Sequence, residues 1–399
     1  MKILITGAKG FVGRNLCESL KNLRDGKDRT RPNVKIEEIY EYDIDSTEQE
    51  LDEYCKNADF VFNFAGVNRP KNQDEFMQGN FGFASELLDA LKKHGNNCPV
   101  MLSSSAQASG VGRFAGSEYG LSKKAGEDLF IEYGKQTGAK TLIYRFPNVF
   151  GKWCRPNYNS AVATFCNNVA NDLPVQVNDR NTELELVYID DLIKEMFDAL
   201  TGKEHRCEFD GLTVLPKDDG KYCFVPTTYK KTLGEIVDLL YVFKSQSETL
   251  FIPEIANGSF DKKLFSAYLS YLPKDKMKFA FNKNEDARGS FTELFKTPSF
   301  GQVSVNVSNP KIVKGEHWHD SKWEMFVVVK GRAIIRERKI GGDEVIEFTV
   351  SGETPEAVYM LPGYTHSIEN LSDTEELITI MWANEPFDKS RPDTFYEKV

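Results

Sequence analysis

Residues 1–13, MKILITGAKGFVG, determine how the first half of the chain is expected to fold. Lys2–Thr6 is a short apolar and β-branched run that leads directly into Gly7, Gly10 and Gly13. This order is typical of a buried strand, a tight turn and the first turn of a helix. Glycines suit such a turn because they let the backbone approach a pyrophosphate, whose charge is attracted by the free N–H groups of a helix N-terminus. The stretch predicts a dinucleotide-binding turn, with a strand-to-helix turn that binds nothing as the alternative.

The composition indicates a soluble chain of more than one domain. At 399 residues the chain is longer than most single hydrophobic cores, so two domains are expected. A net charge of -10 argues against general nucleic-acid binding, because phosphate backbones attract the opposite charge. No signal-peptide pattern and no apolar run long enough to cross a bilayer is present, so we expect a cytoplasmic protein that does not bind membranes. The seven cysteines are scattered, which favours free thiols over disulfides or metal ligation.

The pattern of strands and helices changes along the chain. The first half alternates between the two, with strands expected at 2–6, 34–43, 58–65, 100–105 and 140–144 and helices at 15–23, 80–94 and 116–137. Such alternation predicts an α/β fold with a doubly wound, Rossmann-like parallel sheet. From Phe291 onward, short alternating runs predict an all-β barrel or jelly roll. A linker at 272–275 would separate a domain at 1–274 from one at 275–399.

Two further segments lie between these patterns. The Lys/Asp/Gly-rich stretch from about Thr201 to Tyr229 is expected to be an exposed loop or insertion. Residues 232–243 have the spacing of an amphipathic helix, for which Thr232 is the expected N-cap.

A second group of chemically active side chains is Ser105, Tyr119 and Lys123. Tyr119 and Lys123 are four residues apart on an expected helix and therefore lie on one face. An ammonium beside a phenol stabilises the phenolate and lowers the pKa of the phenol, which would make Tyr119 a usable acid or base near neutral pH. A serine from the end of the preceding strand can hydrogen-bond the same substrate oxygen. The alternative for the Tyr-x-x-x-Lys pair is a solvated helix face.

These motifs, together with YRFPNVFGKW at 144–153, resemble the extended short-chain dehydrogenases/reductases that modify nucleotide sugars. The resemblance implies that Ser105, Tyr119 and Lys123 form the catalytic set, and that Pro147 and Asn148 face the sugar nucleotide. It also implies that the cofactor-binding residues are Gly7, Gly10, Phe11, Val12, Gly13, Ala65, Gly66, Tyr119 and Lys123. Relatives that eliminate water carry an acidic residue directly after the strand-end serine, where this chain has Ala106 and Gln107. Keto reduction or C4 epimerisation is therefore expected in place of elimination.

Two residues in this half have two interpretations each. Asp43 follows the second strand, where a carboxylate would favour the free ribose diol of NADH over the 2′-phosphate of NADPH, or would cap the next helix. Arg180, in VNDRN, has a guanidinium suited to a diphosphate, or is a surface turn arginine.

The C-terminal segment carries a candidate metal site. His317 and His319 point to one face of a strand, Glu324 follows, and His366 comes after Pro362 and Gly363. Three imidazoles and a carboxylate suit Zn²⁺ or another divalent transition metal. Their spacing resembles the paired motifs of the cupin barrel. The alternative is three histidines with no metal.

Just upstream, EDARGSFTE at 285–293 resembles the signature of sugar-nucleotide 3,5-epimerases, in which Arg288 would contact the substrate. Inversion beside a ketone needs a base for the α-proton and a group that holds the enolate charge, and a metal can polarise the keto oxygen. Lys314, close to His317, is a candidate base or acid if burial lowers its pKa, and a solvated loop lysine otherwise.

Taken together, the two halves resemble the bifunctional epimerase/reductase family of UDP-N-acetyl-L-fucosamine synthesis in capsular polysaccharide pathways, which is implied to use NADPH. The resemblance implies that the cupin epimerises C3 of UDP-2-acetamido-2,6-dideoxy-hexos-4-ulose, and that the N-terminal domain then reduces C4 to give UDP-2-acetamido-2,6-dideoxy-L-talose. We expect a UDP-sugar substrate, NADPH or NADH, a divalent metal, and a homodimer or higher homo-oligomer. The alternatives are a redox-neutral UDP-sugar C4 epimerase with a structural cupin, and a sugar-nucleotide sensor without turnover.

Overall fold

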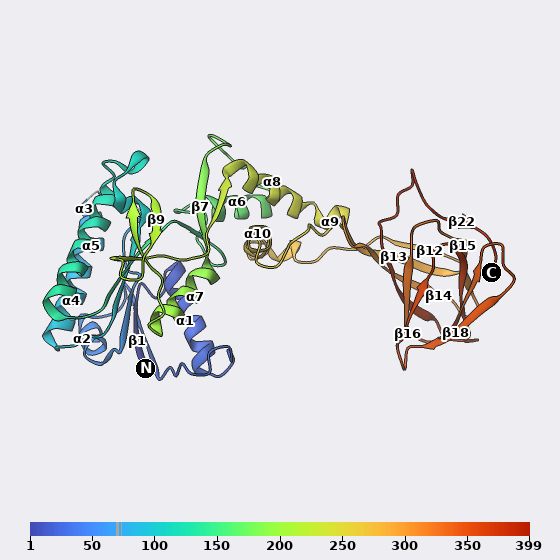
Figure 1. The fold of residues 1–399 in the computed structure, drawn as a ribbon, viewed down its shortest axis with the longest axis horizontal. Coiled ribbons are helices and arrows are strands. Elements are labelled where there is room, and N and C mark those ends of the chain that lie inside the picture. Colours follow the sequence, from blue (N-terminus) through green and yellow to red (C-terminus); the bar gives the residue numbers. More distant parts are fainter. Residues whose placement is uncertain (69–71, 73) are drawn as a thin grey trace. The chain divides into compact units, whose positions relative to one another are not determined.

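The computed structural model describes residues 1–68, 72 and 74–399, and it divides into two compact units. The first unit contains Met1–Leu240 and Phe260–Leu272, and the second contains Tyr241–Ser259 and Pro273–Val399. Figure 1 shows helices and strands alternating in the first unit and mostly strands in the second. Within the described residues, no helix is long and apolar enough to cross a membrane.

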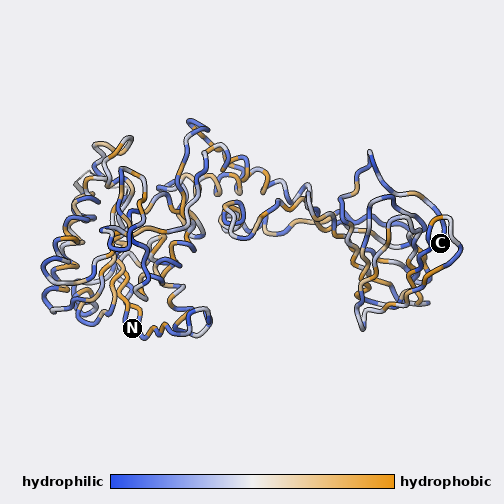
Figure 2. The backbone as a smooth tube through the Cα atoms, in the orientation of Figure 1, coloured by the Kyte–Doolittle hydropathy of each residue, from blue (hydrophilic) through white to orange (hydrophobic). Residues whose placement is uncertain are grey.

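The main sheet of the first unit has the order β2-β1-β3-β4-β5-β10-β8-β9. Its first five strands pair in parallel and are β1 (Lys2–Thr6), β2 (Glu38–Tyr42), β3 (Phe60–Asn63), β4 (Val100–Ser105) and β5 (Thr141–Phe146). One apolar core contains buried residues of α1 (Phe11–Arg24) and α7 (Ile189–Leu200), and the other contains those of α2 (Glu48–Asn57), α4 (Phe83–Lys93) and α5 (Glu118–Thr137). Hydrophobic residues accordingly follow the strands between these helices (Figure 2). The predicted doubly wound sheet is confirmed, although β2 begins at Glu38 and not at Val34.

The segment between about 201 and 229, expected to be an exposed loop or insertion, is not an exposed loop. The segment forms β8 (Arg206–Asp210), β9 (Thr213–Pro216) and β10 (Tyr222–Cys223), which extend the main sheet. Cys223 of β10 pairs in parallel with Tyr144 of β5, and both residues of β10 pair antiparallel with β8. Cys207, Tyr222 and Cys223 are buried. The charged residues that suggested a loop lie mainly in the turn at 217–221 and on the exposed side of short strands.

A smaller sheet completes the first unit, with the order β11-β7-β6. Its strands are β6 (Asn148–Phe150), β7 (Glu183–Tyr188) and β11 (Tyr229–Thr232). Helices α6 (Ala161–Ala170), α8 (Leu233–Lys244) and α10 (Phe260–Leu269) belong to the same part of the sequence. The predicted N-cap is confirmed, because the Thr232 hydroxyl accepts the Glu235 N–H at 3.2 Å and the Glu235 carboxylate accepts the Thr232 N–H at 2.7 Å.

The second unit contains two antiparallel sheets, as the predicted fold class requires. One has the order β12-β13-β14-β21-β16-β19 and the other β18-β17-β20-β15-β22. Buried apolar side chains from both sheets pack into one core, including Phe326, Met360, Ile335 and Ile368. We refer to this arrangement as the β-sandwich. Its strands are β12 (Lys283–Asp286), β13 (Gly289–Thr297), β14 (Gly301–Ser308), β15 (Val313–Trp318), β16 (Glu324–Lys330), β17 (Arg332–Lys339), β18 (Val345–Ser351), β19 (Ala357–Met360), β20 (Tyr364–Asn370), β21 (Leu377–Ala383) and β22 (Phe395–Tyr396).

A buried ion pair joins four elements of the first unit. Glu127 on α5 is fully buried and accepts two hydrogen bonds of 2.7 Å from Arg145 on β5. It also accepts the Ser104 hydroxyl of β4 at 2.7 Å, and Arg145 lies 4.2 Å from the centroid of the Tyr222 ring of β10. Strand β10 therefore covers a charge pair that lies one helical turn beyond Lys123 and beside Ser105.

Removing one partner of this pair tests how strongly it supports the unit. Arg145→Ala should lower the free energy of unfolding by about 3–5 kcal/mol, because it leaves a buried carboxylate without its cation. Urea unfolding measures the change. The matched control is Arg180→Ala, since Arg180 pairs with Asp238 at 2.7 Å with both side chains more than half exposed, and such a pair is worth about 1 kcal/mol or less. Equal losses in the two variants would contradict the interpretation.

Candidate functional site

The glycine turn leads into the start of α1, which no side chain caps. Gly10 is the N-cap residue of this helix. The turn requires glycine: a Cβ at Gly13 would lie 2.1 Å from the Gly7 carbonyl oxygen, and Gly7 itself has a φ of +67°. The free N–H groups of such a helix start are suited to a pyrophosphate. Phe11 and Val12 form the first turn of the helix, as expected.

Asp43 lies beside this turn and is already engaged by the backbone. Its carboxylate accepts the backbone N–H of Lys9 at 2.7 Å and that of Ile44 at 2.8 Å. The Lys9 ammonium pairs with Asp45. The carboxylate at position 43 thus braces the glycine turn, a role that neither of the two interpretations from the sequence included.

The structure brings Ser105, Tyr119 and Lys123 together. Ser105 ends β4, Tyr119 and Lys123 lie on α5, and the Ser117 hydroxyl caps this helix through the Gly120 N–H. Tyr119 shares a hydrogen bond with Ser105, and the Lys123 ammonium lies 5.8 Å from the centroid of the Tyr119 ring. Lys123 is buried and donates to the Ser103 carbonyl at 3.0 Å.

Burial determines the protonation states of this group. It raises the pKa of Tyr119 to about 12, although the hydrogen bond from Ser105 opposes the rise. This direction is opposite to the one expected from the ammonium alone, because loss of solvation outweighs a charge 5.8 Å away. Burial also lowers the pKa of Lys123 to about 8, opposed by the charge of Glu127. At neutral pH the phenol therefore carries a proton that it can donate.

The remaining predicted residues of the first unit lie in different surroundings. Gly66 lies against Lys123, since a Cβ there would be 3.0 Å from the ammonium and 2.5 Å from the Asn80 amide oxygen. Ala65 follows β3 and donates its N–H to the Thr6 hydroxyl at 3.3 Å. Pro147 is half-buried between β5 and β6, and Asn148 is exposed. Arg180 is engaged with Asp238 and the Gly234 carbonyl on the surface.

Sequence reasoning missed Asn80. This residue is buried on the π-helical turn Gln78–Gly82, where its amide bonds the backbone of Val67 and the Ser122 hydroxyl, each at 3.0 Å. It therefore joins the loop after β3 to the helix that carries Tyr119 and Lys123. A π-helical turn at a functional site is a recurrent feature, but the sequence showed only an ordinary helix from Asn80.

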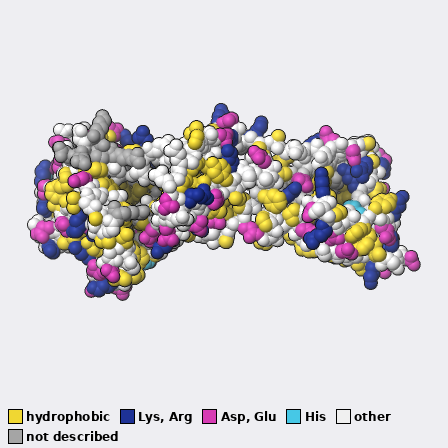
Figure 3. Space-filling model, turned by 90° about the horizontal axis from the view of Figure 1, so that it is seen from above, with side chains coloured by type: hydrophobic (Ala, Val, Ile, Leu, Met, Phe, Trp, Pro, Cys, Tyr) yellow, Lys and Arg dark blue, Asp and Glu magenta, His cyan; other side chains and the backbone are white. Residues whose placement is uncertain are grey.

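In the second unit, four potential ligands converge. Single ligand atoms of His317, His319, Glu324 and His366 all lie within 4.8 Å of one another. The Glu324 carboxylate is 3.7 Å from Nε2 of His319 and 3.6 Å from Nε2 of His366. Among the described residues, these two nitrogens and Oε2 of Glu324 are buried without a hydrogen-bond partner. His317 is partly exposed, and a histidine reaches the face of this unit seen in Figure 3.

The electrostatics of this cluster suit a cation. Burial, with repulsion from His366, lowers the pKa of His317 to about 4, so its imidazole is neutral and has a lone pair to donate. Burial tends to raise the pKa of Glu324, but the neighbouring imidazoles of His319 and His366 hold it well below its usual range. Imidazoles around an ionised carboxylate are a donor set for Zn²⁺ or a similar metal. The residues therefore fit a divalent transition metal.

A second His/Glu/Asp cluster lacks unpartnered ligand atoms on its glutamate. Glu195, Asp198 and His205 are also close together. Glu195 already accepts the Tyr144 hydroxyl at 2.7 Å and the His205 N–H at 2.9 Å, and its other oxygen is 2.6 Å from Nδ1 of His205. Its ligand atoms are therefore satisfied by the protein itself.

A β-bulge places Lys314 on the inner face with the histidines. In β15, Lys314 is opposite the core residue Ile368, and His317 is opposite His366, with a register shift between Gly315 and His317. Directly opposed residues point to the same face, so Lys314 and His317 share it although they are three positions apart. Glu316 takes up the extra residue with a φ of +59°.

Lys314 and Arg288, the other two predicted residues of this unit, differ in exposure. The Lys314 ammonium is half-buried and donates to the Asn306 amide oxygen at 2.8 Å and the Val307 carbonyl at 2.7 Å. Burial lowers the pKa of Lys314. Arg288 is exposed and paired with Asp286 at 2.7 Å.

Lys322 is a neighbour that the sequence did not indicate. It is 7% exposed, and its ammonium lies 3.8 Å from Oε1 of Glu324. Nothing in its sequence context distinguishes it from a solvated loop lysine.

Comparison with known proteins agrees with the two-unit architecture. Residues 3–207 match the model of the NAD dependent epimerase/dehydratase family, and residues 284–395 match the polysaccharide biosynthesis C-terminal domain. The chain is 38% identical over 395 residues to UDP-2-acetamido-2,6-beta-L-arabino-hexul-4-ose reductase of Pseudomonas aeruginosa, covering 99% of this chain and 98% of that one.

Solved structures show the same similarity. The capsular polysaccharide assembling protein CapF from Staphylococcus aureus superposes with a TM-score of 0.87 at 45% identity, covering 100% of both chains. UDP-glucose 4-epimerase from Thermus thermophilus, solved with NAD, matches 68% of this chain with a TM-score of 0.51 at 17% identity, which shows a shared fold alone. The chain therefore belongs to the NAD dependent epimerase/dehydratase family, as a member with a polysaccharide biosynthesis C-terminal domain.

Proposed function

We propose that this protein carries out two consecutive reactions on a UDP-linked 4-keto sugar. The β-sandwich, as a metal-binding cupin, inverts C3 of UDP-2-acetamido-2,6-dideoxy-hexos-4-ulose. The first unit then reduces the C4 ketone with NADPH or NADH to give UDP-2-acetamido-2,6-dideoxy-L-talose, for UDP-N-acetyl-L-fucosamine and capsular polysaccharide synthesis. The observation that carries the proposal is the presence, in one chain, of a phenol next to Ser105 and Lys123 and of an unpartnered His/Glu cluster that shares a face with half-buried Lys314.

The relatives support both the substrate class and the pathway. The Pseudomonas aeruginosa relative is named as the reductase of a UDP-linked acetamido hexul-4-ose, a 4-keto sugar, and it matches this chain over almost its whole length. The Staphylococcus aureus relative is described as assembling capsular polysaccharide. A family of NAD dependent enzymes also implies a nicotinamide cofactor in the first unit.

In the first unit, each side chain has a separate task. A bound nicotinamide cofactor would supply the hydride, and the uncapped start of α1 would hold its pyrophosphate. Tyr119 donates its phenolic proton to the C4 oxygen, and Ser105 hydrogen-bonds the same oxygen. After the proton transfer Tyr119 is a phenolate, and Lys123 places a positive charge beside it. The charge of Glu127 helps Lys123 to stay protonated although it is buried.

In the β-sandwich, Lys314 exchanges the proton at C3. Its hydrogen bonds to Asn306 and Val307 fix its position on the inner face. Burial lowers its pKa, which makes the neutral amine easier to form. A metal held by His317, His319, Glu324 and His366 would supply a Lewis acid that favours enolisation of the ketone. Epimerisation must precede reduction, because the C3 proton is acidic only while the C4 ketone exists.

Replacing the proton donor separates a reductase from a redox-neutral epimerase. Wild-type protein should oxidise one equivalent of NADPH or NADH per keto sugar, followed at 340 nm. Tyr119→Phe should lower this rate about 10²- to 10⁴-fold, the usual contribution of a general acid. Tyr54→Phe is the matched control and should leave the rate unchanged, because Tyr54 is on α2 and stacks on Tyr40 of β2, and neither element carries Ser105, Tyr119 or Lys123. Product formation without net consumption of reduced cofactor would refute the proposed reduction.

The titration of Lys123 should appear in the pH profile. Its pKa of about 8 means that the charge is present below pH 8 and is lost above it. The kcat/KM for the reduced nicotinamide reports groups of the free enzyme and should therefore fall as pH rises through about 8. Lys123→Arg should show a lower rate with no such fall, because a guanidinium stays charged. A profile that is flat to pH 10 in the wild type would contradict the assignment.

Metal content tests the second site directly. Purified full-length protein should carry one divalent transition metal per chain, measured by elemental analysis, and His366→Ala should lose it. His205→Ala should keep it, because its cluster is satisfied by internal hydrogen bonds. Equal metal content in both variants would place the metal elsewhere.

A further inference from the structure

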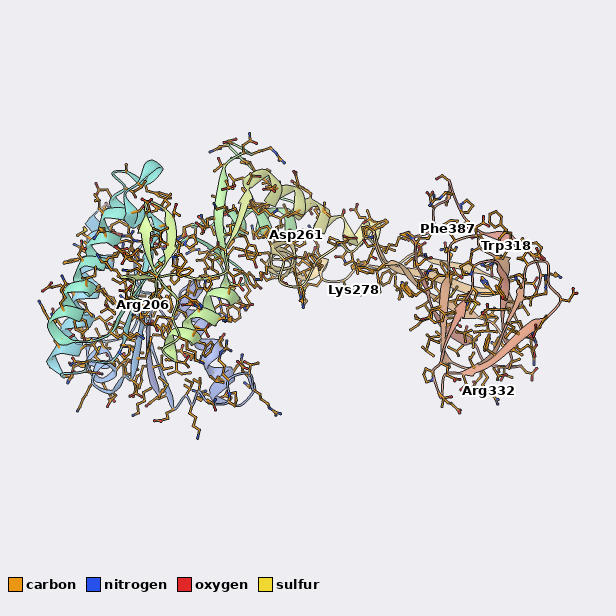
Figure 4. The ribbon with its side chains drawn as sticks, viewed as in Figure 1. Arg206, Asp261, Lys278, Trp318, Arg332 and Phe387 are labelled. Carbon is orange, nitrogen blue, oxygen red and sulfur yellow. The ribbon has the colours of Figure 1, made fainter. Side chains whose placement is uncertain are left out.

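The last residues of the chain lie against the proposed metal site. β22 (Phe395–Tyr396) pairs antiparallel with β15, with Tyr396 opposite His317 and Phe395 opposite Trp318. The sheet order β18-β17-β20-β15-β22 makes this short strand the neighbour of β15 on the side away from β20. Without it, the bulged strand that contains His317 and leads into His319 would be a sheet edge. Figure 4 shows Trp318 and Phe387 toward one end of the β-sandwich and Arg332 at the other.

A backbone carbonyl of this segment determines which nitrogen of His319 can bind a metal. Nδ1 of His319 is 2.5 Å from the carbonyl oxygen of Asp393. A carbonyl can only accept, so Nδ1 carries the proton and Nε2 holds the free lone pair. Nε2 is the buried nitrogen that has no partner in the described structure and that faces Glu324 at 3.7 Å.

The Asp393 carboxylate holds the loop that follows His319. It accepts the backbone N–H groups of Asp320 at 2.8 Å, Ser321 at 3.1 Å and Lys322 at 2.8 Å. This loop connects two of the proposed metal ligands, His319 and Glu324. The Asp393 carboxylate therefore holds the backbone between them. Asp393 adopts a φ of +39°, a conformation that residues other than glycine rarely occupy, so the surrounding contacts must maintain it.

Glu397 connects the segment to the remaining ligands. Its N–H donates to the carbonyl of Glu316 in the β-bulge at 3.0 Å, and its own carbonyl accepts the hydroxyl of Thr365, the neighbour of His366. Its carboxylate is bound by Arg338 at 2.9 Å, and Arg338 also donates to the Lys398 carbonyl at 2.7 Å. The segment thus contacts or adjoins all three imidazoles.

We propose that residues 393–398 form a C-terminal clasp that positions the three imidazoles and fixes the His319 tautomer, and thereby determines the affinity of the site for its metal. The clasp residues are positioning residues, because they act through the ligands and do not themselves reach the metal. The proposal rests on the proposed function only in requiring that the His/Glu cluster binds a metal. Groups that orient metal ligands typically contribute 10- to 100-fold to affinity.

The test is a titration of the metal-stripped, full-length protein with Zn²⁺ in competition with a chromophoric chelator. Asp393→Ala, and a chain that ends at Pro392, should each bind Zn²⁺ about 10- to 100-fold more weakly than wild type. The absorption spectrum of the Co²⁺-loaded protein should also change, since the coordination geometry is altered. Asp388→Ala is the matched control, because Asp388 lies in the same tail and its carboxylate accepts the N–H and the hydroxyl of Ser390. It should match the wild type in both measurements.

The outcomes separate the clasp from the metal site itself. If wild type binds no Zn²⁺ above the level of His366→Ala, the metal proposal and the clasp both fail. If wild type binds Zn²⁺ and Asp393→Ala binds it equally tightly with an unchanged Co²⁺ spectrum, the clasp alone is refuted. Should the shortened chain lose the β-sandwich, as judged by circular dichroism, the substitution Asp393→Ala decides the question.

Discussion

A buried polar atom without a hydrogen-bond partner costs about 1–3 kcal/mol, and this cost separates the buried acidic groups of the chain into two kinds. Glu127 and Glu195 are fully satisfied by neighbouring side chains and backbone. Glu324 is not, and neither are the imidazole nitrogens that face it. The first kind supports the fold. The second kind carries the cost of unpartnered polar atoms, which the metal proposed above would offset.

In the first unit, buried charged groups near Tyr119 have partners within the protein. Lys123 is buried, yet its ammonium donates to the Ser103 carbonyl. Burial lowers the pKa of Lys123, and the negative charge of Glu127 acts against this lowering. Arg145 in turn neutralises Glu127, and the rings of the inserted strands cover Arg145. The strands at 206–223 thus cover the ion pair that lies next to Lys123 on α5. Burial keeps the Tyr119 phenol protonated, which suits the proton donor proposed above.

Much of this arrangement could be predicted because it depends on local sequence. The glycine turn, the four-residue spacing of Tyr119 and Lys123, and the His-x-His pair each encode their geometry within one element. Three features could not be predicted in this way. The strands at 206–223 are short and polar on one side. They can be recognised as strands only from their pairing with one another and, through β10, with β5. The bulge at Glu316 reverses the side to which Lys314 points, and the approach of Asp393 to His319 joins residues 74 positions apart.

The central claim is that one ketone is used twice, first to acidify C3 in the β-sandwich and then as hydride acceptor in the first unit. The most direct measurement is deuterium incorporation at C3 when the UDP-linked 4-keto sugar is incubated in D₂O with no nicotinamide present, followed by NMR. The account predicts that wild type and Tyr119→Phe incorporate deuterium at the same rate and that His366→Ala does not. Exchange that disappears with Tyr119→Phe, or that persists in His366→Ala, would contradict it.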